Sequence, residues 1–432
     1  MTRGFLARAK GHAAKEFMYN LPSERIACQP LGRRDSSKLL VAAVSDDQDA
    51  VSISHRRFSE IARLIPHNAL LVLNDSKVIQ ARLPAVKDTG GKAEILLLRP
   101  SGGRSPSIAL QENASSSRNI WTCMVGGKKL RSGSVLKVGP DRDIDVEIVE
   151  PVGGSVFDVR VGQWNEQKFG KTFGDVIQSL GSTPLPPYIR RKPVEFEEST
   201  YQTVYAKHEG SVAAPTAGLH MSPSVLEELA RKGVQTTTVT LHIGAGTFAP
   251  ISGGHVGQHT MHSERIEVAS ENLKKIVHAR KSGRPIVAVG TTAVRTLESL
   301  YWCGLRILKG MPSSALITSQ WEPYMVMDDQ SQALPDDTDA FEALIERHPE
   351  AIGGETQLLI VPGYNFRTFD LLVTNFHQPE STLLMLVSAF LGGREKLWTV
   401  YDNALANDYR FLSYGDSSIL GPSKLLDEPA SS

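Results

Sequence analysis

Histidine, threonine and glutamate side chains gather in three short segments between Val212 and Val268, each broken by glycine or proline. The segments are VAAPTAGLH, TLHIGAGTFAP and HTMHSERIEV, and each adjoins a run that is typical of a strand. A histidine titrates near neutral pH, and a nearby carboxylate can set its tautomer and basicity. The pattern predicts an enzyme active site in which a rigid sheet presents proton-transfer groups.

The same histidines do not form a recognisable metal-binding pattern. His259, His262 and Glu264 could be combined with His220 or His242, but neither HExxH nor another ligand spacing is present. We expect these groups to act as general acids and bases without a metal. For each histidine taken alone, a hydrogen-bonded structural role is the alternative.

The glycines of TLHIGAGTFAP have the spacing of a dinucleotide-binding fingerprint. Gly244, Gly246 and Ala249 follow a strand, but Pro250 and the residues after it cannot begin the helix that would hold a pyrophosphate. We therefore expect no nicotinamide site. Glycine still permits close backbone approach to a ligand, although a tight turn at a strand end would explain it equally.

Two further strand-to-helix junctions carry polar groups. The strand PIVAVG runs into Thr291 and Thr292, where a threonine can cap a helix while free amides and Arg295 face one point, an arrangement that binds anions. Capping would explain the threonines, but it would not explain an arginine in the first turn. The strand LLV is followed by TNFHQPES, which makes Asn375 and His377 functional candidates at a strand end.

Composition leaves the partner open. Lys plus Arg and Asp plus Glu both number 47, so a nucleic acid would have to use a local patch. The basic clusters GGKKLR from Gly126, YIRRK from Tyr188 and HARKSGR from His278 could contact phosphates or form ordinary surface. The three cysteines are widely separated, which favours a reducing compartment over a disulfide framework or a cysteine-bound zinc site.

The N-terminal residues MTRGFLARAKGHAAK are basic and contain no acidic residue. They predict either an organelle transit segment or a disordered basic tail, because a secretory signal would need an apolar stretch. No apolar run approaches the roughly 20 residues that span a bilayer. We therefore expect a cytoplasmic protein, or an imported one, without a membrane segment.

The chain changes character after about Gly162. Short alternating runs such as AEILLL and DIDVEIVE precede it and predict a small β-barrel, interrupted by a mobile surface loop, SGGRSPSIALQENASSSRN. Strands and amphipathic helices alternate after it and predict an α/β layer architecture. The acidic stretch 321–350 interrupts this pattern and is expected to be a solvated insertion with one short helix at its end.

Taken in order, these segments resemble the S-adenosylmethionine:tRNA ribosyltransferase-isomerase family of queuosine biosynthesis. The resemblance begins at LPSERIACQPLGRRDSSKLLV and continues through LLVLNDSKVIQARL, GGKAEILLL, PLPPYIRR and YQTVYAKHEGSVAAPTAGLHMSP. It then includes TLHIGAGTF, HTMHSERIEV, VGTTAVRTLES, LLVTNFHQPESTLLMLVSAF and YRFLSYGDSSIL. So many ordered blocks are far more specific than any one of them.

The resemblance implies a layered α/β main domain built from both chain ends, with an inserted small antiparallel β-barrel. We place the basic tail at 1–17, the main domain at 18–72 and 162–432, and the barrel at 73–161. It also implies the reaction: the ribosyl part of S-adenosylmethionine moves onto 7-aminomethyl-7-deazaguanine at the tRNA wobble position and rearranges to epoxyqueuosine. Adenine and methionine leave, S-adenosylmethionine is a substrate, and no cofactor is required.

The resemblance and the strand-end placement together give a set of site residues. The expected proton-transfer group is His220, His242, His262 and Glu264, with Asp416 as an orienting carboxylate. The expected substrate-binding residues are Thr216, Gly218, Gly244, Gly246, Thr247, Thr291, Thr292, Arg295, Asn375 and His377.

Some residues depart from the family's pattern. Glu380 stands where a lysine is usual, and Ser417 and Ser418 replace the usual residues after Asp416. These departures leave two alternatives open: a relative that binds S-adenosylmethionine or RNA without turnover, and an enzyme of the same fold with a small-molecule acceptor. The sequence does not indicate an oligomeric state.

Overall fold

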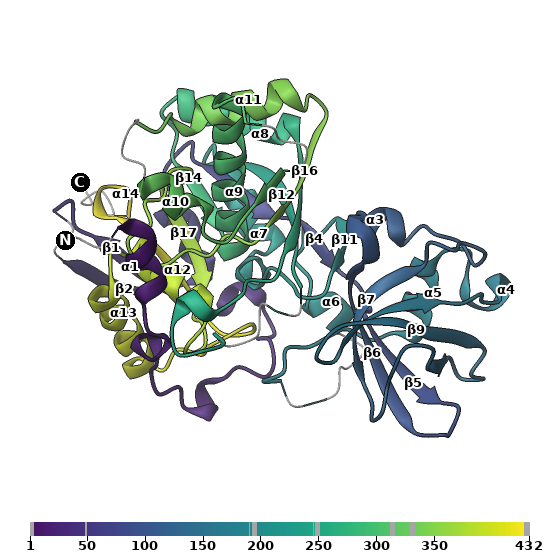
Figure 1. Ribbon diagram of the computed structural model, residues 1–432. Helices are drawn as coiled ribbons and strands as arrows, with labels where there is room; N and C mark the ends of the chain where they lie inside the picture. Colours follow the sequence, from purple (N-terminus) through teal and green to yellow (C-terminus); the bar gives the residue numbers. More distant parts are fainter. Residues whose placement is uncertain are drawn as a thin grey trace.

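The computed structural model describes residues 4–47, 50–189, 191, 197–244, 246, 251–311, 316–328 and 333–426 (Figure 1). Its strands are β1 Lys38–Val44, β2 Val51–Arg57, β3 Leu70–Asn74, β4 Ser76–Val78, β5 Arg82–Lys87, β6 Lys92–Pro100, β7 Ile120–Gly126, β8 Val135–Val138, β9 Ile144–Gly153, β10 Val156–Val161, β11 His208–Ser211, β12 Gln235–His242, β13 Glu264–Ala269, β14 Ile286–Val289, β15 Leu316–Thr318, β16 Ala351–Thr356, β17 Leu371–Asn375 and β18 Ser417–Pro422. Its α-helices are α1 Phe5–Gly11, α2 Ile61–Leu64, α3 Pro106–Ala109, α4 Glu166–Phe169, α5 Phe173–Leu180, α6 Glu197–Thr200, α7 Pro223–Arg231, α8 Ser270–Lys281, α9 Thr291–Leu308, α10 Glu322–Asp328, α11 Asp337–Arg347, α12 Thr382–Phe390, α13 Arg394–Ala406 and α14 Ser423–Leu426.

The main domain is organised around a 10-stranded sheet with the order β15-β16-β13-β12-β3-β14-β17-β18-β1-β2. Its centre, β12, β3, β14 and β17, is parallel, whereas β13 and β18 run antiparallel to their central neighbours. The central strands LLVLN, IVAV and LLVTN are buried throughout. Parallel strands covered on both faces have continuous apolar sequences of this kind.

Helices cover both faces of the sheet. On β3, Leu70 and Val72 belong to a core that includes residues of α8, α9, α11, α12 and α13, while Leu71 and Leu73 pack with residues of α2 and α7. Successive strand residues point to opposite faces, so one apolar strand serves both cores. The main domain is therefore a three-layer α/β structure, and the carboxyl ends of β12, β14 and β17 open at the same edge.

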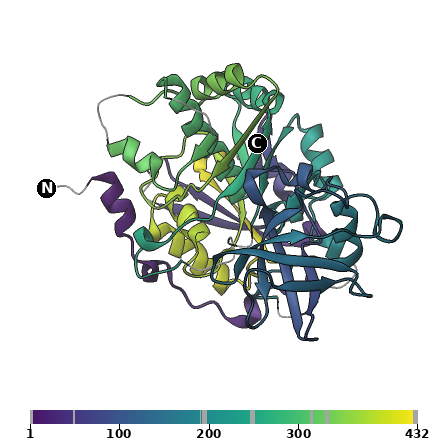
Figure 2. The ribbon, with the colours of Figure 1, turned by 45° about the vertical axis from the view of Figure 1, so that its right-hand side comes forward.

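The second unit is a closed antiparallel barrel with the strand order β10-β7-β6-β5-β8-β9. It forms a separate lobe beside the main domain in Figure 1 and in front of it in Figure 2. Its core includes Phe169, Phe173 and Ile177 from α4 and α5, so the packing of the barrel continues past residue 161. The expected fold class, a layered α/β domain with an inserted β-barrel, is confirmed.

Three sequence expectations about the periphery are wrong. The residues expected to form a basic tail fold onto the main domain: α1 lies against α10, backbone amides of Phe5 and Leu6 donate to the Asp328 carboxylate, and Phe17 is fully buried in the main core. Alanine and phenylalanine side chains between the basic residues provide the apolar contacts.

Among the described residues, no helix is long and apolar enough to cross a membrane.

The acidic stretch 321–350 is not a solvated decoration. It contains two helices, α10 and α11, and Ala340, Phe341 and Leu344 of α11 are buried in the main core. Gly304 of α9 allows close contact, because a Cβ there would stand 2.1 Å from the carbonyl oxygen of Ala340. The acidic residues belong to an amphipathic helix, α11, whose apolar face packs into the core of the main domain.

The loop expected between β6 and β7 is also partly folded. It contains the short helix α3, in which Pro106 and Ala109 are buried, and Leu110 joins the barrel core. Pro106 also packs closely against Gly210 of β11, where an added Cβ would stand 2.3 Å from the proline Cβ. The segment therefore joins the barrel to the main domain.

Candidate active site

An open pocket lies at the carboxyl ends of the central strands, with about 680 Å³ of empty space that is partly continuous with solvent. We call it the strand-end pocket. It is lined by 213–217 after β11, Ile243 after β12, 290–292 after β14, 374–378 at the end of β17, and Tyr188, Ser381, Leu383, Leu412 and Ser413. Open α/β sheets bind ligands at such an edge, so this is the candidate active site.

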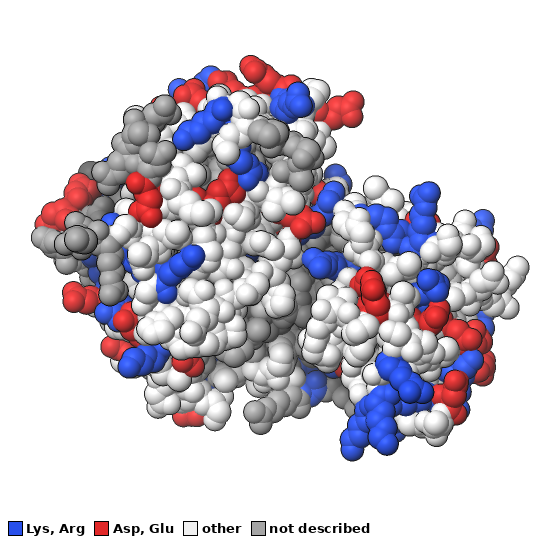
Figure 3. Space-filling view, viewed as in Figure 1, with Lys and Arg blue, Asp and Glu red and all other residues white. Residues whose placement is uncertain are grey.

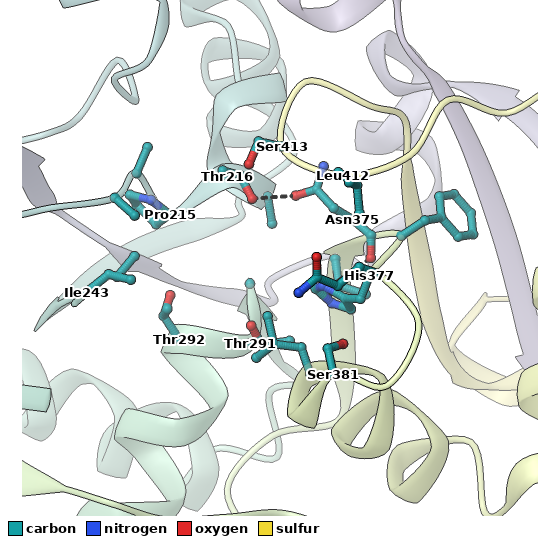
Figure 4. Close-up of a pocket in the computed structure, with 18 of the residues that line it drawn as sticks. Pro215, Thr216, Ile243, Thr291, Thr292, Asn375, His377, Ser381, Leu412 and Ser413 are labelled. Atoms are coloured by element: carbon teal, nitrogen blue, oxygen red, sulfur yellow. Dashed lines mark hydrogen bonds between the residues drawn. The ribbon is translucent and has the colours of Figure 1, made fainter. Parts of the chain in front are cut away.

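Two helices begin at this pocket (Figure 4). Gly290, at φ 91°, precedes α9 without a side-chain cap, so the expectation that a threonine caps this helix is wrong. Thr292 Oγ1 is buried and has no hydrogen-bond partner among the described residues. Ser381 caps α12 by accepting a hydrogen bond from the Leu384 amide at 3.2 Å. The first amides of α9 are therefore available to an anionic group of a ligand.

A chain of hydrogen bonds connects the pocket wall to the interior. Thr216 Oγ1 donates to Asn375 Oδ1 at 3.0 Å, the pair marked in Figure 4, and Asn375 Nδ2 donates to His220 Nε2 at 3.1 Å. His220 Nδ1 lies 2.9 Å from Ser37 Oγ. Because Nε2 accepts, the neutral ring carries its proton on Nδ1, and Ser37 is the acceptor.

The pKa of His220 is lowered to about 4, mainly by burial and to a smaller extent by the charges of Arg410 and Arg34. The imidazole is therefore neutral at pH 7. A neutral histidine can accept a proton, but its Nε2 lone pair is engaged by Asn375 unless a ligand displaces that amide. The arrangement orients Asn375 firmly, because both ends of its amide have partners.

His377 is the second imidazole at the site, and its ring lines the pocket. Its Nε2 lies 3.0 Å from Thr374 Oγ1, and its backbone amide donates to the Tyr401 hydroxyl at 3.0 Å. Burial lowers the pKa of His377 to about 4, so this ring is also neutral at pH 7. His377 is thus an uncharged group positioned to contact a ligand.

Glu264 and Arg295 form a buried ion pair outside the pocket lining. Arg295 Nη1 donates to Glu264 Oε2, and Arg295 Nε donates to the carbonyl of Leu358 at 3.2 Å. Glu264 Oε1 accepts a hydrogen bond from the Gly244 amide at 3.3 Å. The expectation that Arg295 faces the same point as the free amides of α9 is therefore wrong, because its guanidinium turns to the carboxylate on β13.

His242 and His262 also lie outside the pocket lining. His242 is buried near Gly210 in β11, and its ring nitrogens have no hydrogen-bond partner among the described residues. Burial lowers the pKa of His242 to about 4. His262 is exposed and packs against Gly246, where a Cβ would stand 2.1 Å from the ring. The lining of the strand-end pocket therefore contains none of the four expected proton-transfer residues.

The remaining expected residues divide between close packing and loop support. Gly218 accommodates Tyr205, whose hydroxyl would stand 1.9 Å from an added Cβ, whereas Gly244 has open space. Asp416 accepts hydrogen bonds from the amides of Lys38 at 2.9 Å and Arg410 at 2.8 Å, so its carboxylate supports the backbone beside the pocket. Thr247 lies outside the described residues.

Several pocket residues were not singled out from the sequence. The pocket residues Tyr188 and Ser413, and Ser37 beside His220, stand in blocks that were quoted, but serine and tyrosine there give no periodic or spacing signal. Leu412 is more informative in the structure, because it lines the pocket at φ 70°. A bulky residue held in that region is strained, and such strain is often found at functional sites.

The departures from the family's pattern fall at positions with structural explanations. Glu380 lies before the α12 cap at φ 52°, outside the helix, and its amide donates to the Phe17 carbonyl at 3.1 Å. Ser417 and Ser418 begin β18 and are buried, and Ser418 Oγ donates to the Thr374 carbonyl at 3.3 Å. Both sites keep the backbone contacts that hold the pocket.

The predicted basic clusters have different environments. Figure 3 shows Lys and Arg side chains at the lower end of the barrel. In the cluster from Gly126, the Lys128 carbonyl accepts a hydrogen bond from Lys87 Nζ. By contrast, Arg280 and Lys281 of the cluster on α8 pair with Asp337, Asp370 and Glu342, so they stabilise the fold. The cluster from Tyr188 lies partly outside the described residues.

Within the described chain, no group of three or more His, Cys, Asp or Glu residues has metal-binding geometry.

Comparisons with known proteins give a consistent result over most of the chain. The model of a family described as queuosine biosynthesis protein matches residues 14–420. A protein of Aromatoleum aromaticum named S-adenosylmethionine:tRNA ribosyltransferase-isomerase is 39% identical over 407 residues, covering 94% of this chain and 96% of that one. A protein of the same name from Anaeromyxobacter sp. is 38% identical and covers 94% and 98%. The crystal structure of S-adenosylmethionine tRNA ribosyltransferase from Thermotoga maritima is 29% identical, covers 94% and 99%, and has a TM-score of 0.44.

Proposed function

Because the chain belongs to the queuosine biosynthesis protein family, we propose that its strand-end pocket binds S-adenosylmethionine and that tRNA supplies the acceptor. The chain is an S-adenosylmethionine:tRNA ribosyltransferase-isomerase, the activity for which its relatives are named. We further propose that the acceptor is 7-aminomethyl-7-deazaguanine at the wobble position and that the reaction takes place in the cytoplasm. The product is then epoxyqueuosine, with adenine and methionine released.

One observation carries the placement of the donor: the strand-end pocket combines the first amides of α9 with uncharged polar side chains. The amino-acid carboxylate of S-adenosylmethionine fits the amides of α9, near the buried hydroxyl of Thr292. The sulfonium is cationic, and the neutral state of His220 and His377 avoids a like charge beside it. Metal chemistry is not part of this proposal.

The reaction requires a base at the donor and a neutral acceptor amine. The sulfonium acidifies the adjoining ribose 5′-carbon, so a positioned base can remove a proton there while an acid assists the departure of adenine. His377 lines the pocket and is our candidate for contact with the donor. Asn375 is held by Thr216 and His220, so we propose that it positions the ribose.

Adenine release from S-adenosylmethionine tests the function directly. Purified protein is incubated with the donor and with tRNA that carries either 7-aminomethyl-7-deazaguanine or guanine at the wobble position, and the tRNA is then analysed by mass. We expect adenine release and an added ribosyl-derived mass only with the modified tRNA. A parallel incubation without tRNA completes the test: adenine release there would favour an enzyme that does not need a tRNA acceptor, and binding of both substrates without release would contradict an enzyme.

A further inference from the structure

A second pocket adjoins the strand-end pocket and has a different character. It has about 500 Å³ of empty space, and its lining includes Arg34, Arg410 and His220. We call it the arginine pocket. None of its lining residues is an aspartate or glutamate. Gly32, one of its lining residues, is exposed, and nothing lies within 4 Å of a Cβ added to it.

The charges in the arginine pocket are only partly balanced. Arg34 donates to the backbone carbonyls of Gln202 at 2.5 Å and Ser199 at 2.6 Å, and it has no carboxylate partner among the described residues. Burial lowers the pKa of Arg34, which reflects how poorly its charge is solvated. Arg410 lies 3.8 Å from Asp416, whose carboxylate already accepts two backbone amides. The pocket therefore favours an anion, and a guanidinium plane can also stack on a base.

The two pockets meet at one place. Ser413 lines both, and the hydrogen bond of 3.1 Å between His220 Nε2 and Asn375 Nδ2 joins a residue of one lining to a residue of the other. A transfer between two substrates needs their reacting atoms to come together at such a boundary. The neutral, partly apolar pocket suits the sulfonium donor, while the cationic pocket suits a nucleotide with its phosphate.

We propose that the arginine pocket holds the acceptor nucleotide of the RNA, with a phosphate at Arg410 and the base directed toward His220. This inference rests on the proposed function and adds the location of the acceptor. The wall between the pockets then determines where the aminomethyl nitrogen approaches the donor. His220 and Asn375 lie at that wall, so displacement of their hydrogen bond by the acceptor would expose His220 Nε2.

Substitution of Arg410 by Gln tests the proposal with separate readouts for the two substrates. Equilibrium binding of tRNA carrying 7-aminomethyl-7-deazaguanine is measured without donor, and binding of S-adenosylmethionine is measured by calorimetry without tRNA. We expect tRNA affinity to fall about tenfold or more, because a charge-assisted hydrogen bond is lost. The slope of log affinity against log salt should decrease by about one. Donor affinity should stay within about twofold, since Arg410 lies outside the strand-end lining.

Further variants show whether a loss of tRNA affinity comes from the arginine pocket or from a folding defect. Gly32→Trp adds bulk at a lining residue of the arginine pocket without changing a charge and should also weaken tRNA binding. Arg347→Gln removes an exposed arginine on α11, and Gly11→Trp adds the same bulk at a glycine with no neighbour within 4 Å. Neither control lines the strand-end pocket or the arginine pocket. Both should retain wild-type affinities, and Arg410→Lys should recover part of the tRNA affinity.

The outcomes separate this inference from the proposed function. Loss of donor affinity with unchanged tRNA affinity in Arg410→Gln and Gly32→Trp would overturn the proposal and place part of S-adenosylmethionine in the arginine pocket. Unchanged affinity for both substrates would also overturn it. If wild-type protein binds modified tRNA in an Arg410-dependent manner but releases no adenine, the acceptor site stands and the proposed function fails.

Discussion

Two regions of the molecule meet at the first two turns of α9: the strand-end pocket and the buried Glu264–Arg295 pair. From the sequence, we expected the threonines and the arginine of these turns to face the same point. Thr291 and Thr292 line the strand-end pocket, whereas Arg295, one turn later, turns away and pairs with Glu264. In the strand-end pocket, the buried imidazole of His377 is neutral and polar groups remain available to a ligand. In the Glu264–Arg295 region, the two charges pair with each other, although Arg295 Nη2 has no hydrogen-bond partner among the described residues. The difference teaches that buried ionisable residues near a site can hold its walls without taking part in its chemistry.

The largest effect should come from breaking the buried ion pair. Glu264→Ala leaves Arg295 as an uncompensated buried charge, so we expect the free energy of unfolding to fall by about 3–5 kcal/mol. Denaturant titration measures this change. The double variant Glu264→Ala/Arg295→Met should recover part of it. A stable Glu264→Ala protein that loses turnover by about two orders of magnitude would instead make Glu264 the catalytic base.

The next prediction concerns turnover instead of stability, and its expected effect is slightly smaller. It tests the two buried imidazoles at the site, His220 and His377. His220→Ala removes the support of Asn375 and a neutral proton acceptor, so turnover should fall by about two orders of magnitude, equivalent to about 2.7 kcal/mol. His377→Ala tests the imidazole that lines the pocket in the same assay. Adenine release and thermal unfolding are measured together. His262→Ala is the control, because its exposed ring lies outside the pocket lining, and near-normal turnover in both pocket variants would remove them from the mechanism.

The third prediction concerns His242, a buried neutral histidine outside the pocket lining. It tests whether this residue affects stability without affecting turnover. The folded-state pKa of His242 is about 4, below its unfolded value near 6.5, so its contribution to stability is present above pH 6.5 and is lost as pH falls toward 4. His242→Asn should lessen the loss of stability between pH 7 and pH 5 by about 2 kcal/mol. Turnover at pH 7 should change little. Unfolding curves at both pH values check this, and a strong loss of turnover would move His242 into the site.

The smallest effect concerns the amino end of α9. Thr292→Val keeps the shape and removes the buried hydroxyl, so we expect the KM for S-adenosylmethionine to rise about tenfold, equivalent to about 1.4 kcal/mol. The KM for tRNA should stay unchanged. Thr292→Ser keeps the hydroxyl and serves as the control. A rise in the KM for tRNA alone would contradict the placement of the donor carboxylate at this helix.

Much of the architecture could be read from local sequence. The runs LLVLN, IVAV and LLVTN specified buried strands, and alternating runs before Gly162 specified the barrel. Strand-end polar residues also pointed to Thr216, Asn375 and His377, which do line one pocket. The errors arose where we predicted structure from charged composition alone. The basic residues around Phe17 and the acidic residues around Phe341 lie beside apolar side chains that the main core buries.

The sequence by itself determined the fold class, the family and the strand ends at which a ligand can bind, because periodicity and ordered motifs are properties of neighbouring residues. Only the tertiary structure decided which polar residues share a cavity. Ser37, Asn375 and the pair Thr216 and His220 come from three separate parts of the chain but form one hydrogen-bonded line, while Glu264 and Arg295 pair with each other. The direction of a side chain and the partner that it meets depend on how the strands and helices pack, and spacing along the chain does not contain that information.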